Sequence, residues 1–186
     1  MKSIKLFLTL CLGLLFLNFA PKQDNKPTVY TVGDSTVKNG SGKGDGGLWG
    51  WGDFIGQFLD VSKVTIENHA LGGTSSRTFQ DKGLWEPVFK KLKKGDYVLI
   101  QFGHNDNGPI NDDSRARGTI KGIGEATEEI DNILTKKHEI VHTYGWYIQK
   151  LVREAKSKGA IPVICAGLVI TLLGNTVYAP VVPAAL

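Results

Sequence analysis

The sequence predicts an α/β fold in which a parallel sheet is wound with right-handed crossovers. Short β-rich runs alternate along the chain with segments of helical period, a pattern typical of parallel sheets. One run, residues 97–102, is continuously apolar apart from Gln101, as expected of a strand buried on both faces. The length of 186 residues suits one domain with an ordinary core. No internal repeat or second domain is evident in the sequence.

The expected elements follow one another along the chain. β-Rich or apolar runs bounded by turn residues are the expected strands, at residues 28–33, 64–68, 97–102 and 160–165. Segments that repeat apolar residues at helical spacing are the expected helices, at residues 51–59, 85–94 and 144–157. Gly95 and Gly159 end the last two helices. Because ligands of such sheets lie outside the carboxyl ends of the strands, the residues just after each strand are the best candidates for function.

The first residues have the layout of a secretory signal peptide. Lys2 and Lys5 form a charged start, and an almost uninterrupted apolar run follows to Ala20. We therefore expect residues 1–20 to be a signal peptide and residues 21–27 a linker. A retained membrane anchor is the alternative, although the run is short for a spanning helix. A secreted or periplasmic protein without stable membrane association is predicted, and Cys165 alone would remain after cleavage, so no internal disulfide is expected.

The charge distribution and the histidine spacing indicate neither nucleic-acid binding nor a metal site. The net charge is +4, with 22% charged and 41% hydrophobic residues, an ordinary balance for a globular protein. The lysine cluster after the second apolar helical pattern is interpreted as a solvated helix end: Lys90, Lys91, Lys93 and Lys94. His138 and His142 are four residues apart and could share a helix face. No ligand-like spacing surrounds them, so no metal site is predicted.

Ser35 follows the first expected strand, where a helix is expected to begin. A serine hydroxyl at that place is exposed above the sheet, near helix N–H groups that can stabilise an oxyanion. The surrounding residues, Gly-Asp-Ser-Thr at 33–36, differ from the Gly-x-Ser-x-Gly elbow of α/β-hydrolases. Serine, threonine and aspartate are also common helix caps, so these residues alone leave a purely structural role open.

Two later segments follow expected strands in the same way. The paired glycines Gly72 and Gly73 let the backbone approach a ligand and leave an N–H group free. Asn105 is placed to aim amide N–H groups at a developing oxyanion, whereas the neighbouring His104 is a weaker candidate for a base. Each segment taken alone is also consistent with an ordinary turn.

Taken together and in order, these blocks resemble the SGNH (GDSL) hydrolase superfamily. Gly-Asp-Ser-Thr at 33–36, Gly73 within 68–73, and Gly-His-Asn-Asp at 103–106 stand in the order of its first three blocks. The closer resemblance is to bacterial rhamnogalacturonan acetylesterases and covers residues 28–164. It adds Thr-Val-Tyr at 28–30, Trp-Gly at 51–52, Gly-Asp-Tyr-Val at 95–98 and Val-His-Thr-Tyr-Gly-Trp at 141–146.

The resemblance implies a fold, a reaction and a set of site residues. The fold is a three-layer α/β/α sandwich with a parallel, flavodoxin-like sheet. Ser35 would be the nucleophile, and the backbone N–H groups of Ser35 and Gly73 with the side chain of Asn105 would form the oxyanion hole. Candidate substrate-binding residues are Asp34, Thr36 and His104. The reaction is removal of O-acetyl groups from a pectic, rhamnogalacturonan-type polysaccharide through an acetyl-serine intermediate, with no metal or organic cofactor.

The sequence departs from this family pattern after residue 164. The family's base is a histidine three residues after an aspartate, whereas this sequence has no histidine beyond His142. None of the residues 160–186 is charged, and the segment 165–186 is interpreted as an aberrant apolar tail. A frameshift or truncation is the expected explanation; completion by another chain and a membrane-inserted tail are the alternatives. Residues 28–164 would then be an incomplete hydrolase domain, expected to be inactive or insoluble alone.

Other functions on the same fold stay open. A non-catalytic glycan-binding protein would keep the cleft without the triad, although core packing is the default for its tryptophans, Trp49, Trp51, Trp85 and Trp146. An SGNH esterase or lipase with another substrate is the third interpretation, because the fold alone does not determine the substrate.

Overall fold

The central sheet is parallel over most of its width, as predicted. The computed structural model describes residues 26–165, 169–170, 176–177 and 182–183. Neighbouring strands of the sheet are, in order, β2 (Thr65–Asn68), β1 (Thr28–Gly33), β3 (Tyr97–Gln101), β6 (Ile161–Ile164) and β9 (Val182–Pro183). The first four are mutually parallel, and β9 pairs antiparallel with β6. The predicted α/β class is therefore confirmed.

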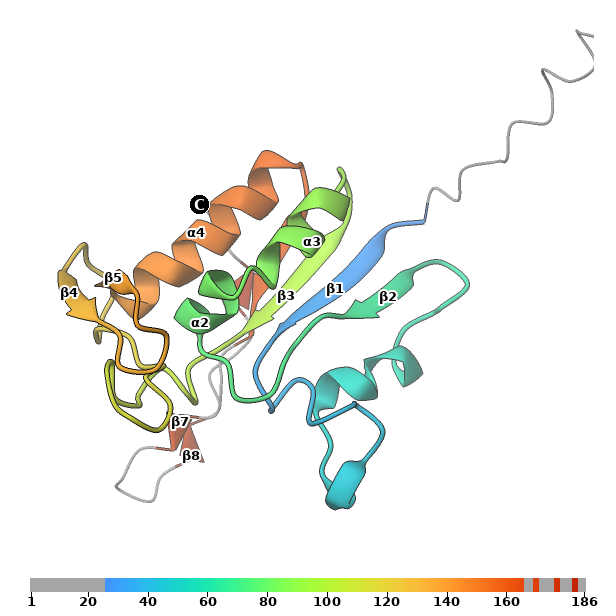
Figure 1. The fold of residues 1–186 in the computed structure, drawn as a ribbon. Helices are drawn as coiled ribbons and strands as arrows, with labels where there is room; N and C mark the ends of the chain where they lie inside the picture. Colours follow the sequence, from blue (N-terminus) through green and yellow to red (C-terminus); the bar gives the residue numbers. More distant parts are fainter. Residues whose placement is uncertain (1–25, 166–168, 171–175, 178–181, 184–186) are drawn as a thin grey trace, which may run out of the picture.

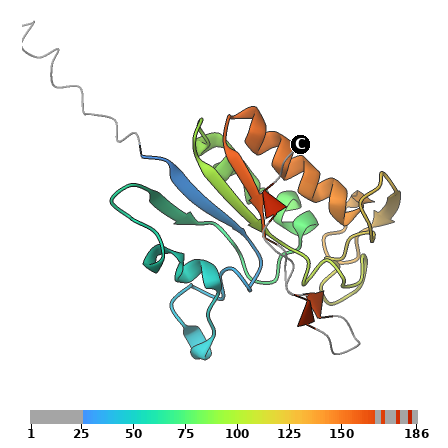
Figure 2. The same ribbon diagram turned by 180° about the vertical axis from the view of Figure 1, so that it is seen from behind.

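The helices α2 (Ser76–Asp81), α3 (Trp85–Lys91) and α4 (Tyr144–Ser157) lie together on one face of the sheet, as the two opposite views show (Figures 1 and 2). Apolar side chains of both layers form the core between them: Val32, Val98, Ile100, Phe79, Trp85 and Leu151. Each is at most 1% exposed. Burying a side chain of this kind contributes about 1.5–3 kcal/mol, which explains why the helices stay on this face.

The opposite face of the sheet carries apolar side chains that are in contact with water. Tyr97 on β3 and Ile161 on β6 are partners in register, and they are 38% and 45% exposed. Leu99 and Val163, the next pair along the same two strands, are half-buried. The two faces of the sheet therefore differ strongly in how well they are covered by the described residues.

Two expected helices near the N-terminal part of the sheet are replaced by turns. Residues 51–59 form the short 3₁₀ segments η2 (Trp51–Asp53) and η3 (Ile55–Gln57), and Phe58 is 82% exposed, so the predicted single helix is wrong. The N–H groups of Trp51 and Gly52 donate to the carbonyls of Thr36 and Val37. These long-range bonds hold the segment against the loop after β1 and compete with a regular helix. That loop is itself a turn rather than the helix expected after Ser35.

A β-hairpin appears where the sequence indicated no strand. β4 (Thr127–Asp131) pairs antiparallel with β5 (His138–His142). The two histidines at the ends of β5 thus lie on a strand, and the suggestion that they share a helix face is wrong. α2 was also unpredicted, and η1 (Asp45–Gly47) lies within the glycine-rich region before η2.

The predicted signal peptide lies outside the described residues and stays a prediction. Most of the apolar tail is outside them as well; its described parts are β7 (Val169–Ile170) and β8 (Thr176–Val177), which pair with each other, and β9. Within the described ranges, no helix has both the length and the apolar character needed to cross a membrane.

Candidate active site

The loops that follow β1, β2 and β3 meet at one end of the sheet. Because these strands are parallel neighbours, their carboxyl ends lie at the same edge. The three loops carry Ser35, Gly73 and Asn105. Hydrogen bonds and close contacts join the loops to one another and fix the positions of these three residues.

The first loop holds Ser35 in a tight turn. Asp34 is 1% exposed, and its Oδ1 accepts hydrogen bonds from the N–H and the hydroxyl of Thr36, both at 2.8 Å. The carbonyl of Asp34 accepts from the N–H groups of Val37 and Lys38 at 3.1 Å. Ser35 is half-buried between these anchored neighbours. The turn therefore fixes the backbone on both sides of the Ser35 hydroxyl.

The glycine loop after β2 lies beside Ser35. A Cβ atom built on Gly72 would lie 3.5 Å from the Cβ of Ser35, so the two loops lie side by side. Gly73 has φ +81°, a left-handed conformation that favours glycine, and it is exposed. The N–H of Leu71 donates to the carbonyl of Gly33 at 3.0 Å, which ties this loop to the end of β1.

Asn105 joins the third loop to the second. Its side chain is buried, and its Nδ2 donates to the carbonyl of Thr74 at 2.7 Å, directly after Gly73 in the chain. A primary amide has two N–H groups, so one stays available to a ligand. The structure thus brings together the hydroxyl, the glycine backbone and the carboxamide that were singled out from the sequence.

Asp106 locks the third loop onto α2. Its carboxylate is 5% exposed and accepts hydrogen bonds from the N–H and hydroxyl of Ser76, at 3.1 and 2.5 Å, and from the N–H of Gly103 at 3.0 Å. Burial nevertheless raises the pKa of Asp106 above its usual value, with these hydrogen bonds opposing the rise. Its role in the structure is to position the loop that carries Asn105.

Comparison with known proteins assigns the chain to a family. The GDSL-like Lipase/Acylhydrolase family matches residues 29–175. The chain belongs to the GDSL (SGNH) hydrolase family. The resemblance inferred from the three ordered blocks is thereby confirmed.

Named relatives of this SGNH hydrolase include rhamnogalacturonan acetylesterases. One from Emericella nidulans is 34% identical over 133 residues, which are 72% of this chain and 49% of the relative. RhgT of Bacillus subtilis is 40% identical over 81 residues, 44% of this chain and 34% of the relative. The crystal structure of YxiM from B. subtilis aligns with a TM-score of 0.53 and 26% identity, over 76% of this chain and 33% of that one. The chain spans about half or less of the length of these proteins.

The remaining predicted site residues of the SGNH hydrolase differ in accessibility. The carboxylate of Asp34 is buried within its own turn, whereas Thr36 and His104 are exposed. Within the described part of the chain, no histidine or carboxylate forms a hydrogen bond with the Ser35 hydroxyl. A serine needs such a base to be a good nucleophile at neutral pH.

Two connections at the site were missed by sequence reasoning. Trp51 donates from Nε1 to Oε1 of Gln101 at 2.6 Å, and Gln101 donates from Nε2 to the hydroxyl of Thr36 at 2.7 Å. Arg117 donates from Nη1 to the carbonyl of Gly73 at 2.8 Å. Gln101 ends a strand, a position that could have marked it. Arg117 lies in a long segment without period, and nothing in the sequence around it indicated a role.

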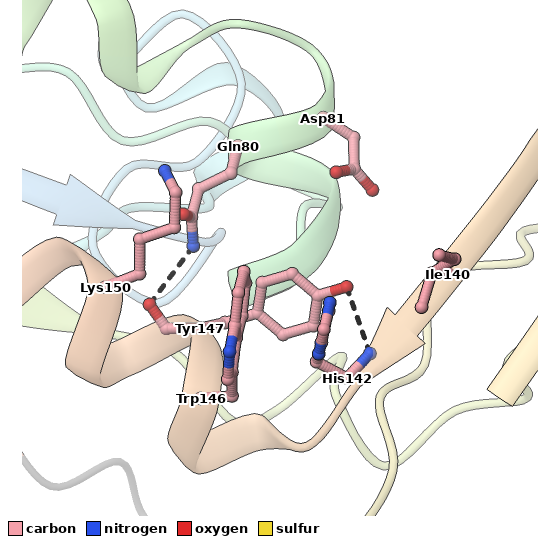
Figure 3. Close-up of a pocket in the computed structure, with 7 residues that line it drawn as sticks. All are labelled: Gln80, Asp81, Ile140, His142, Trp146, Tyr147 and Lys150. Carbon is pink, nitrogen blue, oxygen red and sulfur yellow. Dashed lines mark hydrogen bonds between the residues drawn. The ribbon is translucent and has the colours of Figure 1, made fainter. Parts of the chain in front are cut away.

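A pocket of about 240 Å³ lies apart from these loops, between α2, β5 and α4 (Figure 3). It is lined by Gln80, Asp81, Ile140, His142, Trp146, Tyr147 and Lys150. The rings of His142 and Trp146 stack with centroids 3.8 Å apart, and the backbone N–H of His142 donates to the hydroxyl of Tyr147 at 3.3 Å. None of the catalytic or substrate-binding residues predicted from the sequence lines this pocket.

Proposed function

We propose that this SGNH hydrolase removes O-acetyl groups from a pectic, rhamnogalacturonan-type polysaccharide. The proposal is carried by one observation: Ser35, the Gly72–Gly73 backbone and the Asn105 carboxamide adjoin at the carboxyl edge of the sheet. The named rhamnogalacturonan acetylesterases among the relatives support the substrate class. A substrate in the plant cell wall also agrees with secretion, which we propose from the apolar N-terminus.

In the proposed reaction, the Ser35 oxygen attacks the acetyl carbonyl carbon and the carbonyl oxygen becomes an oxyanion. The N–H groups of Ser35 and Gly73 and one N–H of Asn105 stabilise that charge, and each such donor contributes roughly 3 kcal/mol. Loss of the sugar hydroxyl leaves an acetyl-serine, which water then hydrolyses to acetate. A base must take the serine proton and return it to the sugar oxygen.

The test measures acetate release from acetylated rhamnogalacturonan by two proteins. One is the 186-residue chain, which we expect to be inactive or nearly so. The other, the extended protein, is the same chain continued at its C-terminus by a segment with the Asp-x-x-His of the family pattern. We expect the extended protein to release acetate and Ser35→Ala to reduce its kcat by roughly 10⁴-fold or more. A Ser41→Ala variant in the next, exposed loop is the matched control. Undiminished turnover in the Ser35→Ala protein removes Ser35 from its proposed role.

The glycan-binding alternative receives little support from the tryptophans. Trp85 is 1% exposed and offers no free stacking surface, whereas Trp51 is half-buried and donates a hydrogen bond from its Nε1 to Gln101. Trp146 is stacked on His142, which leaves Trp49, at 48% exposure, as the open aromatic side chain of the four. Sugar stacking usually needs such an exposed ring.

A further inference from the structure

The guanidinium group of Arg117 lies at the rim of the candidate active site. Its Nη1 donates to the carbonyl of Gly73 at 2.8 Å and would lie 3.6 Å from a Cβ atom built on that glycine. The side chain is half-buried, and a guanidinium has five N–H donors. One hydrogen bond to Gly73 therefore leaves several donors for another group beside the oxyanion position.

The segment before Arg117 is held in place by hydrogen bonds to Asp112 and Arg77. Asp112 accepts hydrogen bonds from the N–H groups of Arg115 and Ala116, which lower the pKa of its carboxyl to about 2. Ala116 has φ +40°, a conformation that costs a non-glycine residue roughly 1–2 kcal/mol. Its carbonyl accepts a hydrogen bond from Nη2 of Arg77, which is 1% exposed. The structure thus fixes the backbone that presents Arg117, at a cost in strain.

Arg117 has no carboxylate partner among the residues that the structure describes. Ion pairs there join other residues, and none includes Arg117. The nearest acids at the site are committed elsewhere: Asp34 to Thr36, and Asp106 to Ser76 and Gly103. Burial and the neighbouring Arg115 lower the pKa of Arg117, whereas the charges of Asp34, Asp112 and Asp106 oppose the decrease without a direct ion pair.

We propose that Arg117 binds the carboxylate of a uronic acid unit next to the acetylated sugar and thereby determines specificity for acidic polysaccharides. The assignment rests on the proposed function for its substrate class. A guanidinium matches a carboxylate with two parallel hydrogen bonds, and partial burial strengthens such a pair. Because the same group holds the Gly73 carbonyl, a bound uronate is placed in register with the Gly73 N–H that faces the ester.

The experiment measures binding of hexagalacturonate to the 186-residue chain by calorimetry. Its fully methyl-esterified form is the uncharged matched ligand. Arg117→Gln is expected to weaken binding of the acid about 10- to 100-fold, the range for a charged hydrogen-bonded contact. Binding of the methyl ester should change less than about twofold, because it lacks the carboxylate. Arg117→Lys keeps the positive charge but cannot form two parallel hydrogen bonds. Its affinity for hexagalacturonate should therefore lie between those of the parent chain and the Arg117→Gln variant.

If Arg117 only holds the Gly73 carbonyl, the Arg117→Gln variant should bind the acid and the methyl ester equally less tightly. That result would overturn the assignment. No binding of hexagalacturonate by the parent chain overturns it as well. Arg115→Gln is the matched control, because it removes the same charge two residues away without a contact to Gly73. If Arg115→Gln loses as much affinity for hexagalacturonate as Arg117→Gln does, the acid is held by general electrostatic attraction and not by a specific contact. That result also overturns the proposal. Circular dichroism of each variant checks the fold.

The experiments distinguish failure of the proposed esterase function from failure of the proposed role of Arg117. If the extended protein hydrolyses no acetyl ester while Arg117 discriminates the two ligands, the uronate site stands and the esterase proposal falls. If it hydrolyses acetylated rhamnogalacturonan while Arg117→Gln affects acid and ester alike, the esterase proposal stands and the role of Arg117 falls.

Discussion

The side chain of Asn105 holds the glycine loop and, in the proposed reaction, also donates to the oxyanion. One of its N–H groups fixes the Thr74 carbonyl, and the other is the donor proposed for the oxyanion. Substitution of Asn105 therefore removes the proposed oxyanion donor and loosens the glycine loop at the same time. The two effects have different kinetic signatures, since a lost oxyanion donor lowers kcat whereas a displaced loop also raises KM.

Asn105→Ala in the extended protein is expected to lower kcat for an aryl acetate about 10²- to 10³-fold. The physical reason is that the donor acts more strongly on the transition state than on the substrate. Asn107→Ala is the control, because Asn107 is exposed on the same loop. Steady-state kinetics provide the measurement, and a change confined to KM would contradict a role at the oxyanion.

Asp81 makes stability depend on pH in an unusual direction. Its pKa is raised to about 6, chiefly by burial and further by Glu139, while Arg77 and Lys150 oppose the rise. The folded state thus binds more protons than the unfolded chain between pH ~4 and ~6, so the free energy of unfolding falls as pH rises through that window.

Asp81→Asn removes this titration and should stabilise the protein at pH 8 relative to the parent chain. The gain is expected to be below about 1 kcal/mol, because the half-exposed side chain is screened by water. At pH 4 the parent residue is protonated, and the gain should vanish. Urea unfolding at both pH values is the measurement; an equal difference at pH 4 and 8 would show that Asp81 is not the titrating group.

At the scale of elements, α4 shows which signals in a sequence determine a helix. Its apolar residues recur at helical spacing, and Gly159, with φ +74°, lies just past its end, so its bounds were predicted correctly. β4 was missed because its strand sequence is mostly charged, with Ile130 as its one buried residue. The helix predicted for 51–59 failed because bonds to Thr36 and Val37 outweigh the apolar spacing.

The N-terminus of α4 depends on Thr143. Its hydroxyl accepts a hydrogen bond from the N–H of Trp146 at 3.1 Å and donates to the carbonyl of Gly124 at 2.5 Å. Thr143→Ala leaves both groups without a partner and is expected to destabilise the fold by about 1–2 kcal/mol. Thr143→Ser keeps the cap and should cost much less. Thermal unfolding decides, and equal melting temperatures for the alanine and serine variants would rule out the cap as the cause.

The part of the candidate site that is formed by residues directly after strands could be predicted from the sequence. Parallel strands bring the residues after them to one edge, so the meeting of the first three loops follows from their order in the sequence. Arg117 escaped prediction because its place depends on long-range bonds, such as that of Arg77 to Ala116, 39 residues away. Contacts of this kind leave no period and no spacing in the sequence.

For the whole molecule, the asymmetry of the sheet matters most. The helices cover one face, while Tyr97 and Ile161 form an adjacent exposed pair on the other. Exposed apolar strand faces are surfaces on which chains associate. The molecule is therefore expected to self-associate through this face.

Replacing both Tyr97 and Ile161 by lysine should reduce concentration-dependent association of the 186-residue chain. Charged side chains at these positions oppose stacking of two sheet faces at little cost, because both sites are already exposed. Val61→Lys, at a 61% exposed position in a loop, is the control. Light scattering during gel filtration gives the measurement, and an unchanged elution profile for the double variant would locate the association elsewhere.

The chain of bonds from Trp51 through Gln101 to Thr36 has an optical consequence. The indole lies two hydrogen bonds from the residue beside Ser35, and indole emission depends on the polarity around its N–H. A ligand that binds at the serine turn is expected to change the surroundings of the indole without contacting the ring. We therefore expect the emission of Trp51 to report whether the candidate site is occupied.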